Sequence, residues 1–370
     1  MEMFLSGMTY AAIACVVIIP FSYADEKVSW GAFIDTYYAY DFNNPPNHDR
    51  VLVNSGANGI TNTYTTTAAR SNEFNINLAY LEAKVVDEDY RGRLALQTGT
   101  SVEANEVNEP NVGIFGGPTL SRNIQEASVG YHVDPKLWID AGIFPSYVGF
   151  ENFISKYNWT YTRSLSADAT PYFESGVKAT YEISDQVRIQ FHVMNGWTNL
   201  TEDNGSKAVG LQVTYKPNSI YSVTYNTFYG LMAPGNFPRF FNQWIGTLSL
   251  SPSLQLETNF DLGFQEKADH SGMANWHDVT LLMRKLISKK LAASFRLEDY
   301  VDPYQLDVTT GTANGFQTWG YSVGLDCRMK ERILWRTEYR ELFSRDSVFV
   351  GSGSPSSQDP LIVTSLSLTI

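Results

Sequence analysis

Charged side chains recur at every second position near the carboxyl end of the chain. From residue 332 to 343, one face carries Arg332, Leu334, Arg336, Glu338 and Arg340, and Arg328 and Arg296 belong to the two segments before it. A period of two places such residues on one side of a β-strand. A row of guanidinium and carboxylate groups can form a ladder of ion pairs that braces a wall, or it can meet a charged solute in water. Both interpretations stay open at this point.

A second set of charges lies around an unusually long connection. The alternating segments 137–144 and 173–183 predict two strands, and residues 145–171 between them far exceed the usual connection of about 4–6 residues. This connection contains Glu151 and Asp168, and Glu174 follows it. Its many aromatic residues argue against disorder. We therefore expect an ordered loop that folds into the interior of a hollow structure.

Other chemistry is sparse. The five histidines are scattered along the sequence, and no spacing typical of metal ligands links them. Glu103, Glu106 and Glu109 cluster in a polar segment, where a solvated face is the simpler explanation than cation binding. No phosphate-binding loop, nucleophile elbow or Ser/His arrangement is present. The sequence gives no support for an enzyme, a cofactor or a metal.

The elements that position these charges form a regular series. Short turns are expected at 87–90, 134–136, 184–186, 217–219, 251–253, 288–290 and 330–331, and longer connections at 43–72, 104–121, 145–171, 195–206, 231–240, 266–274, 301–315 and 344–359. These connections separate about 16 strands, among them a predicted strand from Arg91 to Val102. Short and long connections alternate, which is typical of a transmembrane antiparallel up-and-down β-barrel with periplasmic turns and external loops.

The composition of the two strand faces is consistent with a wall between lipid and water. Trp319, Tyr321 and Val323 alternate with Gly320 and Ser322. A soluble β-sandwich would alternate in the same way. Strand length and the aromatic residues near strand ends favour the all-β membrane barrel.

The N-terminus predicts export. Residues 11–21 are apolar, and Ser22-Tyr23-Ala24 resembles a cleavage site, so we expect a signal peptide at 1–24 and an outer-membrane barrel at 25–370. No later segment approaches the roughly 18 apolar residues of a membrane helix. The net charge of −12 argues against a nucleic-acid partner, because binding phosphate groups requires a basic surface.

Several short motifs resemble a known family. LWIDAGIFPSYVGFE at 137–151, YTRSL at 161–165, GVKA at 176–179, NGW at 195–197 and VTYKP at 213–217 are similar to the OmpL-like putative β-barrel porin family. The resemblance implies a porin in the cell outer membrane, with outer-membrane lipid and small hydrophilic solutes as partners and a possible homotrimer. One departure is the last residue, Ile370, where outer-membrane barrels usually end in an aromatic residue.

The expected function is a water-filled channel for passive diffusion of small hydrophilic solutes and ions. The alternatives are a solute-selective channel, for example for sugars, with Phe33, Tyr37, Trp138 and Phe228 as a sliding surface, or a structural or adhesive surface barrel. As the resemblance implies, the long third external loop folds into the lumen. We expect its region to bring Glu151, Asp168 and Glu174 opposite the wall residues Arg296, Arg328, Arg332, Arg336 and Arg340, with the fifteenth strand closing beside the first. Such opposed charges would form a constriction with a transverse field.

Overall fold

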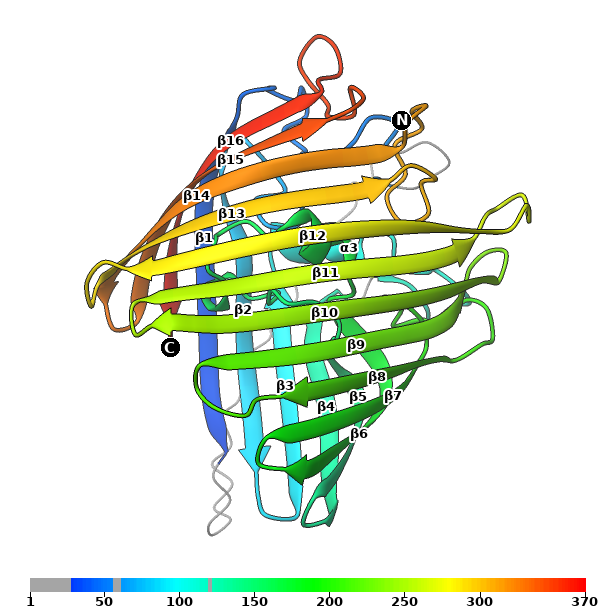
Figure 1. The fold of residues 1–370 in the computed structure, drawn as a ribbon, viewed down its shortest axis with the longest axis vertical. Coiled ribbons are helices and arrows are strands. Elements are labelled where there is room, and N and C mark those ends of the chain that lie inside the picture. Colours follow the sequence, from blue (N-terminus) through cyan, green and yellow to red (C-terminus); the bar gives the residue numbers. More distant parts are fainter. Residues whose placement is uncertain (1–27, 56–60, 119–121) are drawn as a thin grey trace, which may run out of the picture.

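The computed structural model describes residues 28–55, 61–118 and 122–370. In this part of the chain, 16 antiparallel strands form a closed barrel (Figure 1). The first eight strands are β1 Ser29–Asp41, β2 Phe74–Val86, β3 Tyr90–Thr98, β4 Ile124–Asp134, β5 Leu137–Pro145, β6 Phe173–Ser184, β7 Val187–Met194 and β8 Ala208–Tyr215. The others are β9 Tyr221–Met232, β10 Phe237–Ser251, β11 Leu254–Glu266, β12 Met273–Leu286, β13 Leu291–Asp302, β14 Phe316–Lys330, β15 Ile333–Ser344 and β16 Gln358–Thr369. The predicted all-β barrel with about 16 strands is confirmed.

The barrel closes between its first and last strands. Strand β1 pairs with β2 and with β16, in a register that sets Tyr37 opposite Ser365. Strand β15 pairs with β14 and β16. The expectation that the fifteenth strand lies beside the first was therefore wrong, because the terminal segment forms a complete sixteenth strand between them.

Alternation along the strands separates an apolar exterior from a polar interior. In β14, the outward side chains Trp319 and Val323 are 46% and 52% exposed, whereas Thr318 and Ser322 are 1% and 0% exposed. A soluble β-sandwich buries its apolar face, so this inverted arrangement rules out that alternative and suits a lipid environment. Within the described residues, no helix is long and apolar enough to cross a membrane.

Connections at one end of the barrel are short and those at the other end are long. Strands β10 and β11 are joined by a turn of two residues, and β14 and β15 by another. The predicted strand 91–102 ends earlier than expected, at Thr98. Gly99 follows with a φ of 136°, which a residue with a Cβ rarely adopts, and α1, Thr100–Glu106, begins there. The predicted signal peptide, residues 1–24, lies outside the described residues.

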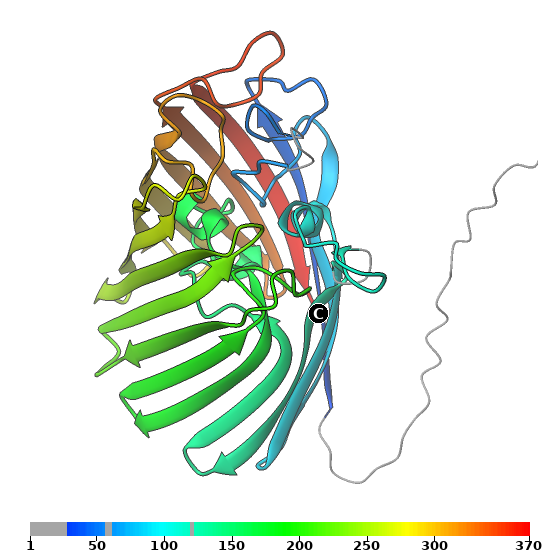
Figure 2. The same ribbon diagram turned by 90° about the vertical axis from the view of Figure 1, so that its right-hand side faces the viewer.

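The longest loop after the one that joins β1 to β2 follows β5. Residues 146–172, hereafter the long loop, contain the short 3-10 helix η2, Ser155–Tyr157, and the helix α3, Leu165–Ala169. Ser164 caps α3, because its hydroxyl accepts a hydrogen bond from the Ala167 amide at 3.1 Å. Figure 1 and Figure 2 show α3 and the adjoining loop within the ring of strands.

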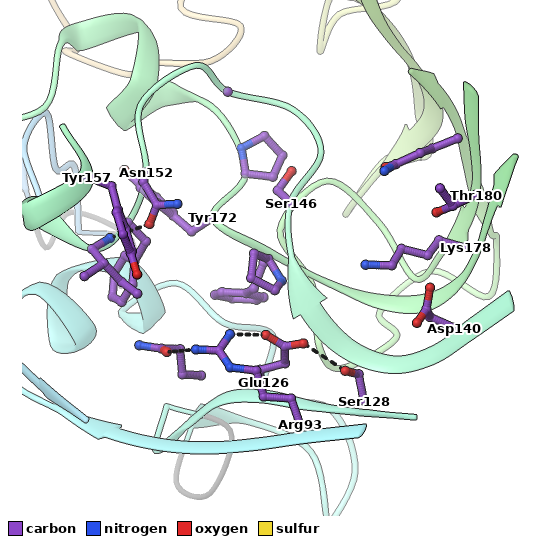
Figure 3. Close-up of a pocket in the computed structure, with 18 of the residues that line it drawn as sticks. Arg93, Glu126, Ser128, Asp140, Ser146, Asn152, Tyr157, Tyr172, Lys178 and Thr180 are labelled. Atoms are coloured by element: carbon purple, nitrogen blue, oxygen red, sulfur yellow. Dashed lines mark hydrogen bonds and ion pairs between the residues drawn. The ribbon is translucent and has the colours of Figure 1, made fainter. Parts of the chain in front are cut away.

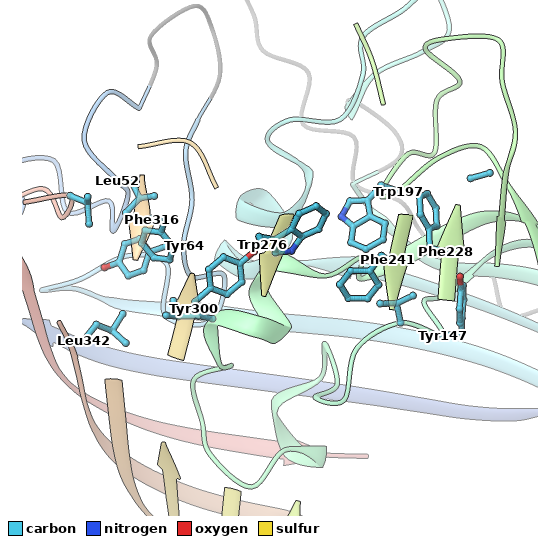
Figure 4. Packing of buried hydrophobic residues seen from close by; sticks show 14 of the residues in the cluster. Leu52, Tyr64, Tyr147, Trp197, Phe228, Phe241, Trp276, Tyr300, Phe316 and Leu342 are labelled. Atoms are coloured by element: carbon cyan, nitrogen blue, oxygen red, sulfur yellow. The ribbon is translucent and has the colours of Figure 1, made fainter. Parts of the chain in front are cut away.

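An apolar cluster lies inside the barrel where the strands meet the long connections (Figure 4). It combines strand side chains such as Phe228, Phe241 and Trp276 with loop side chains such as Tyr64 and Trp197. Trp197 packs edge-on against Phe228 and Phe241, with ring centroids 4.7 and 5.0 Å away. These inward aromatics therefore pack against loop residues instead of lining open water.

Candidate pore and its wall

The long loop is fastened to the inner face of the barrel by hydrogen bonds to strand side chains. The Gly149 amide donates to Gln243 of β10 at 2.8 Å, and the Ser155 hydroxyl donates to Asp35 of β1 at 2.7 Å. The hydroxyl of Ser166 donates to Asp261 of β11 at 2.9 Å. Since these acceptors come from strands spread around the barrel, the loop spans the interior from one side to the other.

Two wall glutamates bind the middle of the long loop. Glu338 of β15 accepts hydrogen bonds from the amides of Tyr161 and Thr162 at 2.6 and 2.8 Å and from the Thr162 hydroxyl at 2.6 Å. Glu298 of β13 accepts from the Leu165 amide at 2.7 Å. Carboxylates that accept several amide hydrogen bonds form strong, directed contacts. They fix the backbone of the loop against β13 and β15.

Three arginines surround these glutamates and form what we call the arginine cluster: Arg296, Arg336 and Arg340. Arg296 donates from Nη1 to the carbonyl of Thr162 at 2.6 Å and from Nε to Glu298 at 3.1 Å. Arg340 binds Glu298 through Nε and Nη2 at 3.1 and 3.0 Å. All three side chains are at most 2% exposed.

Arg336 reaches the loop from β15. Its Nη1 donates to the carbonyl of Ser155 at 2.6 Å, its Nη2 donates to the carbonyl of Asn158 at 2.7 Å, and its Nε pairs with Asp326 at 2.8 Å. A guanidinium with all edges engaged by protein acceptors is held in a fixed orientation. The arginine cluster thus lies behind the long loop, between the loop and the wall.

The remaining sequence-predicted arginines lie elsewhere. Arg328 is near the end of β14 and Arg332 lies in the turn between β14 and β15, and both are exposed. The structure does not bring them to the long loop. Arg332 therefore does not continue the row of strand residues that begins at Arg336.

The three predicted acids occupy different surroundings. Glu151 is 8% exposed, accepts from the Ser164 amide at 2.7 Å and lies 3.8 Å from Arg296. Burial raises the pKa of the Glu151 carboxyl, and the nearby Arg296 opposes this shift. Asp168 accepts hydrogen bonds from the hydroxyls of Thr66 and Tyr172 at 2.7 and 2.9 Å. Neither carboxylate faces an arginine across open space.

Glu174 lies at the start of β6, beneath the long loop. It accepts a hydrogen bond from the Ser146 hydroxyl at 2.9 Å, and its second oxygen is 3.3 Å from Nδ1 of His192. His192 stacks on Tyr147 with ring centroids 4.0 Å apart. Glu174 is therefore hydrogen-bonded to the base of the loop and lies beside His192 of β7.

Open space lies on the opposite side of the long loop. A cavity of about 800 Å³, hereafter the passage, is bounded by strands β2 to β7, by α1 and by loop residues that include Ser146, Asn152 and Tyr157 (Figure 3). Its charged lining comprises the bases Lys84, Arg91, Arg93, Lys136, Arg163, Lys178 and Arg188 and the acids Glu82, Glu106, Glu126, Asp140, Glu151 and Glu182. Most of these residues were not among the predicted site residues.

Ion pairs organise the passage wall. Arg93 of β3 pairs with Glu82 of β2 at 2.6 Å and with Glu126 of β4. Arg91 binds both oxygens of Asp140 at 2.6 and 2.5 Å. Charges recur at alternate positions of β2, β3 and β6, so the sequence places these residues on one face of each strand. It does not indicate that this face borders a cavity, because that depends on where the long loop lies.

The four aromatic residues predicted to form a sliding surface for a solute do not form one. Phe33, Tyr37 and Phe228 are 0%, 3% and 2% exposed, so they offer no face to a solute. Trp138 does line the passage, but its ring stacks on His132 at 4.5 Å and lies 4.3 Å from the Arg91 guanidinium. Across the described residues, no group of three or more His, Cys, Asp or Glu is arranged to hold a metal ion.

These features define a class of protein: a closed β-barrel of the outer-membrane channel type, with an apolar exterior, short turns at one end and a charged interior. The family follows from the sequence. Residues 27–370 match the family described as putative beta-barrel porin-2, OmpL-like, and the chain belongs to that family. It is accordingly an outer-membrane porin. No match was found among curated proteins.

Solved porin structures share the fold at low sequence identity. The anion-selective porin from Comamonas acidovorans aligns with a TM-score of 0.60 and 11% identity over 94% of this chain and 100% of that chain. The outer-membrane channel DcaP of Acinetobacter baumannii aligns with a TM-score of 0.59 and 10% identity over 94% of this chain and 99% of that chain. Salmonella typhi OmpF, in complex with daunomycin, aligns with a TM-score of 0.60 and 11% identity over 93% of this chain and 98% of that chain. At these identities the likeness establishes the barrel architecture alone.

Proposed function

We propose that this porin is a narrow diffusion channel for small hydrophilic solutes and ions, with its route running between the long loop and strands β2 to β7. The observation that carries the proposal is the asymmetric interior. A charged cavity of about 800 Å³ lies on one side of the long loop, and a buried arginine cluster holds the loop on the other. Pore width and wall charge together determine which solutes pass.

In this proposal the long loop forms the constriction, and the predicted site residues divide into two roles. Arg296, Arg336 and Arg340 hold the loop against β13 and β15, and Glu151 contributes to that attachment from the loop itself. Arg328 would act only near the periplasmic end of the barrel. The direct wall charges of the route are instead those of β2 to β7.

Conductance of purified protein in planar bilayers tests the proposal. We expect small, steady steps, and deletion of residues 152–166 should raise the conductance because it removes the part of the loop that borders the route. Deletion of residues 352–354, at an exposed loop tip, serves as the matched control and should leave conductance unchanged. An unchanged conductance after the first deletion would mean that the loop does not limit flow.

A structural or adhesive barrel with a closed lumen is the second candidate. The apolar cluster around Phe241 and Trp276 favours it, because loops and strand side chains pack together in that part of the interior. Complete absence of channel current from folded protein would support this function over the first. The sugar-selective alternative has less support, since the inward aromatic rings are covered.

Orientation, export and assembly stay predictions. Single cysteines introduced in a Cys327→Ser background at residues 266–274 or 344–359 should react with a membrane-impermeant reagent on intact cells, whereas those at 134–136 or 251–253 should not. The mass of the mature protein should correspond to cleavage of the signal peptide after Ala24. The mass of the detergent-solubilised complex would test the homotrimer.

A further inference from the structure

The charges along the passage are unequally balanced. Within the described residues, the lining acids Glu82, Glu126, Asp140 and Glu182 each pair with an arginine of the same wall. The lining lysines Lys84, Lys136 and Lys178 form no ion pair in that same part of the chain. The four acids share three arginines, because Arg93 pairs with both Glu82 and Glu126, and one negative charge remains among these pairs. The three lysines outweigh it and leave a surplus of two positive charges among these ten residues. This surplus does not follow from composition, because the whole chain carries a net charge of −12.

One lining acid contributes little negative charge. Glu106 of α1 is 1% exposed, and its Oε2 atom has no hydrogen-bond partner among the described residues. Burial, followed by the neighbouring Glu109, raises the pKa of Glu106 to about 8. The carboxyl is then largely neutral at pH 7. It therefore does little to offset the positive surplus.

Among the three lining lysines, Lys178 of β6 lies nearest the long loop. Arg163, the lining base within that loop, also forms no ion pair in the described part of the chain, but it is 2% exposed and its guanidinium lies 4.0 Å from the centre of the Tyr172 ring. In the sheet, Lys178 stands directly opposite Asp140 of β5 on one side and His192 of β7 on the other. Asp140 is engaged through both oxygens by Arg91, and one oxygen of Glu174 accepts from the Ser146 hydroxyl. The carboxylate directly opposite Lys178 in the sheet is thus committed to another partner.

The geometry around Lys178 leaves its ammonium open to a solute. Its Nζ atom lies 4.5 Å from the centre of the Phe144 ring, which gives electrostatic support but no hydrogen-bond acceptor. Figure 3 shows the amine pointing into the cavity, with Thr180 beside it on β6 and Ser146 at the edge of the long loop. An ammonium flanked by hydroxyl groups suits an anionic oxygen atom.

We infer that the passage conducts small anions in preference to cations, and that Lys178 is the group that contacts the carboxylate or phosphate of a passing solute. The inference rests on the proposed function and deepens it, since it names the class of solute. The arginines of the wall contribute through their pairs, and Lys178 contributes the uncompensated charge at the level of the long loop.

Reversal potentials measured in a KCl gradient test this inference. We expect wild-type protein to favour chloride, and Lys178→Gln to lower the chloride-to-potassium permeability ratio by about fivefold, which corresponds to one unit charge acting at about 4 Å in water. Lys178→Glu should lower the ratio further. The matched control is Lys289→Glu, which makes the same change of charge in the exposed turn between β12 and β13 and should leave the ratio unchanged.

Inorganic phosphate provides a second measurement. It should reduce the chloride current through wild-type channels, and Lys178→Gln should weaken this block without lowering the conductance in KCl. The neutral variant keeps the test decisive if the charge reversal impairs folding. A conducting channel that is unselective or cation-selective, or whose selectivity and phosphate block ignore Lys178, would overturn the inference while leaving the diffusion channel intact. Absence of current from folded wild-type protein would overturn both.

Discussion

The two inner walls of this barrel use the same residue types for opposite purposes. On β13 and β15, Arg296, Arg336 and Arg340 are at most 2% exposed and bind the backbone or the carboxylates that hold the long loop. On β2 to β5, Arg91 and Arg93 pair with carboxylates across the sheet, and their side chains are 35% and 21% exposed. The first wall is covered by the loop, and the second borders the passage.

This difference shows that a row of inward charges does not by itself define a pore. A buried guanidinium needs several acceptors to offset its lost hydration, and the loop carbonyls of Ser155, Asn158 and Thr162 supply them. A partly hydrated guanidinium needs fewer protein acceptors, because water supplies the others. The side of the barrel on which the loop lies therefore decides which charged side chains hold the loop and which border the passage.

The largest expected effect is on stability, at the covered wall. Arg296→Met should lower the free energy of unfolding by about 3–5 kcal/mol, because it leaves buried carboxylates without their counter-charge. Arg91→Met is the comparison on the passage wall, where the arginine side chain is 35% exposed. Because the variant leaves the largely buried Asp140 without its hydrogen-bonded partner, the expected loss is about 1–3 kcal/mol, less than at Arg296. Urea unfolding of the folded protein in lipid vesicles measures both. Equal losses for the two variants would contradict the distinction between the walls.

The next effect concerns conductance. The double variant Arg336→Glu and Arg340→Glu should raise conductance toward that of the 152–166 deletion. It removes the Arg336 attachment of the loop and the Arg340 pair that holds Glu298, and it places new carboxylates beside Asp326 and Glu298. From sequence, the same variant is expected to shift the reversal potential toward cations. The buried positions instead predict a smaller shift than Lys178→Glu produces. A large shift of the reversal potential with unchanged conductance would show that these arginines face the pore and do not hold the loop.

A smaller effect is expected with pH, at Glu106 on α1. Its pKa rises from 4.5 to about 8 in the folded protein, mainly through burial, so the neutral carboxyl is the form that folding favours. The stabilisation is fully present below pH 4.5 and is lost as the pH rises through about 8. Amide hydrogen exchange in α1, corrected for intrinsic rates, should show protection that falls over this window. Glu106→Gln should remove the pH dependence, and an identical profile in the variant would assign it to another group.

The smallest effect is expected at the exposed end of the passage wall. Arg188 and Glu182 pair at 2.6 Å with side chains 52% and 41% exposed. Arg188→Gln should change the free energy of unfolding by less than about 1 kcal/mol, because water screens an exposed pair. The same urea measurement checks it. A loss comparable with that of Arg296→Met would show that the passage wall is more tightly packed than its exposure indicates.

The sequence by itself determined the architecture. The period-two pattern indicates which side chains share a face, and the alternation of short and long connections gives the up-and-down order of the strands. Both signals are local, so they survive without knowledge of distant contacts. The end of β3 was not predicted correctly, because Gly99 turns the chain into α1 through a backbone conformation with a positive φ. The alternation of side chains carries no information about that conformation.

Only the tertiary structure decided what the charges do. The row of Arg336, Glu338 and Arg340 reads the same in sequence whether it faces water or a loop. Its burial depends on loop backbone groups more than 170 residues away, such as the carbonyl of Ser155 at a sequence separation of 181. Lys178 likewise has no ion pair because Asp140, the residue directly opposite it in the sheet, is held by Arg91. Alternation fixes the face of a strand on which a charge lies, but the partner of that charge is set by which distant segment packs against that face.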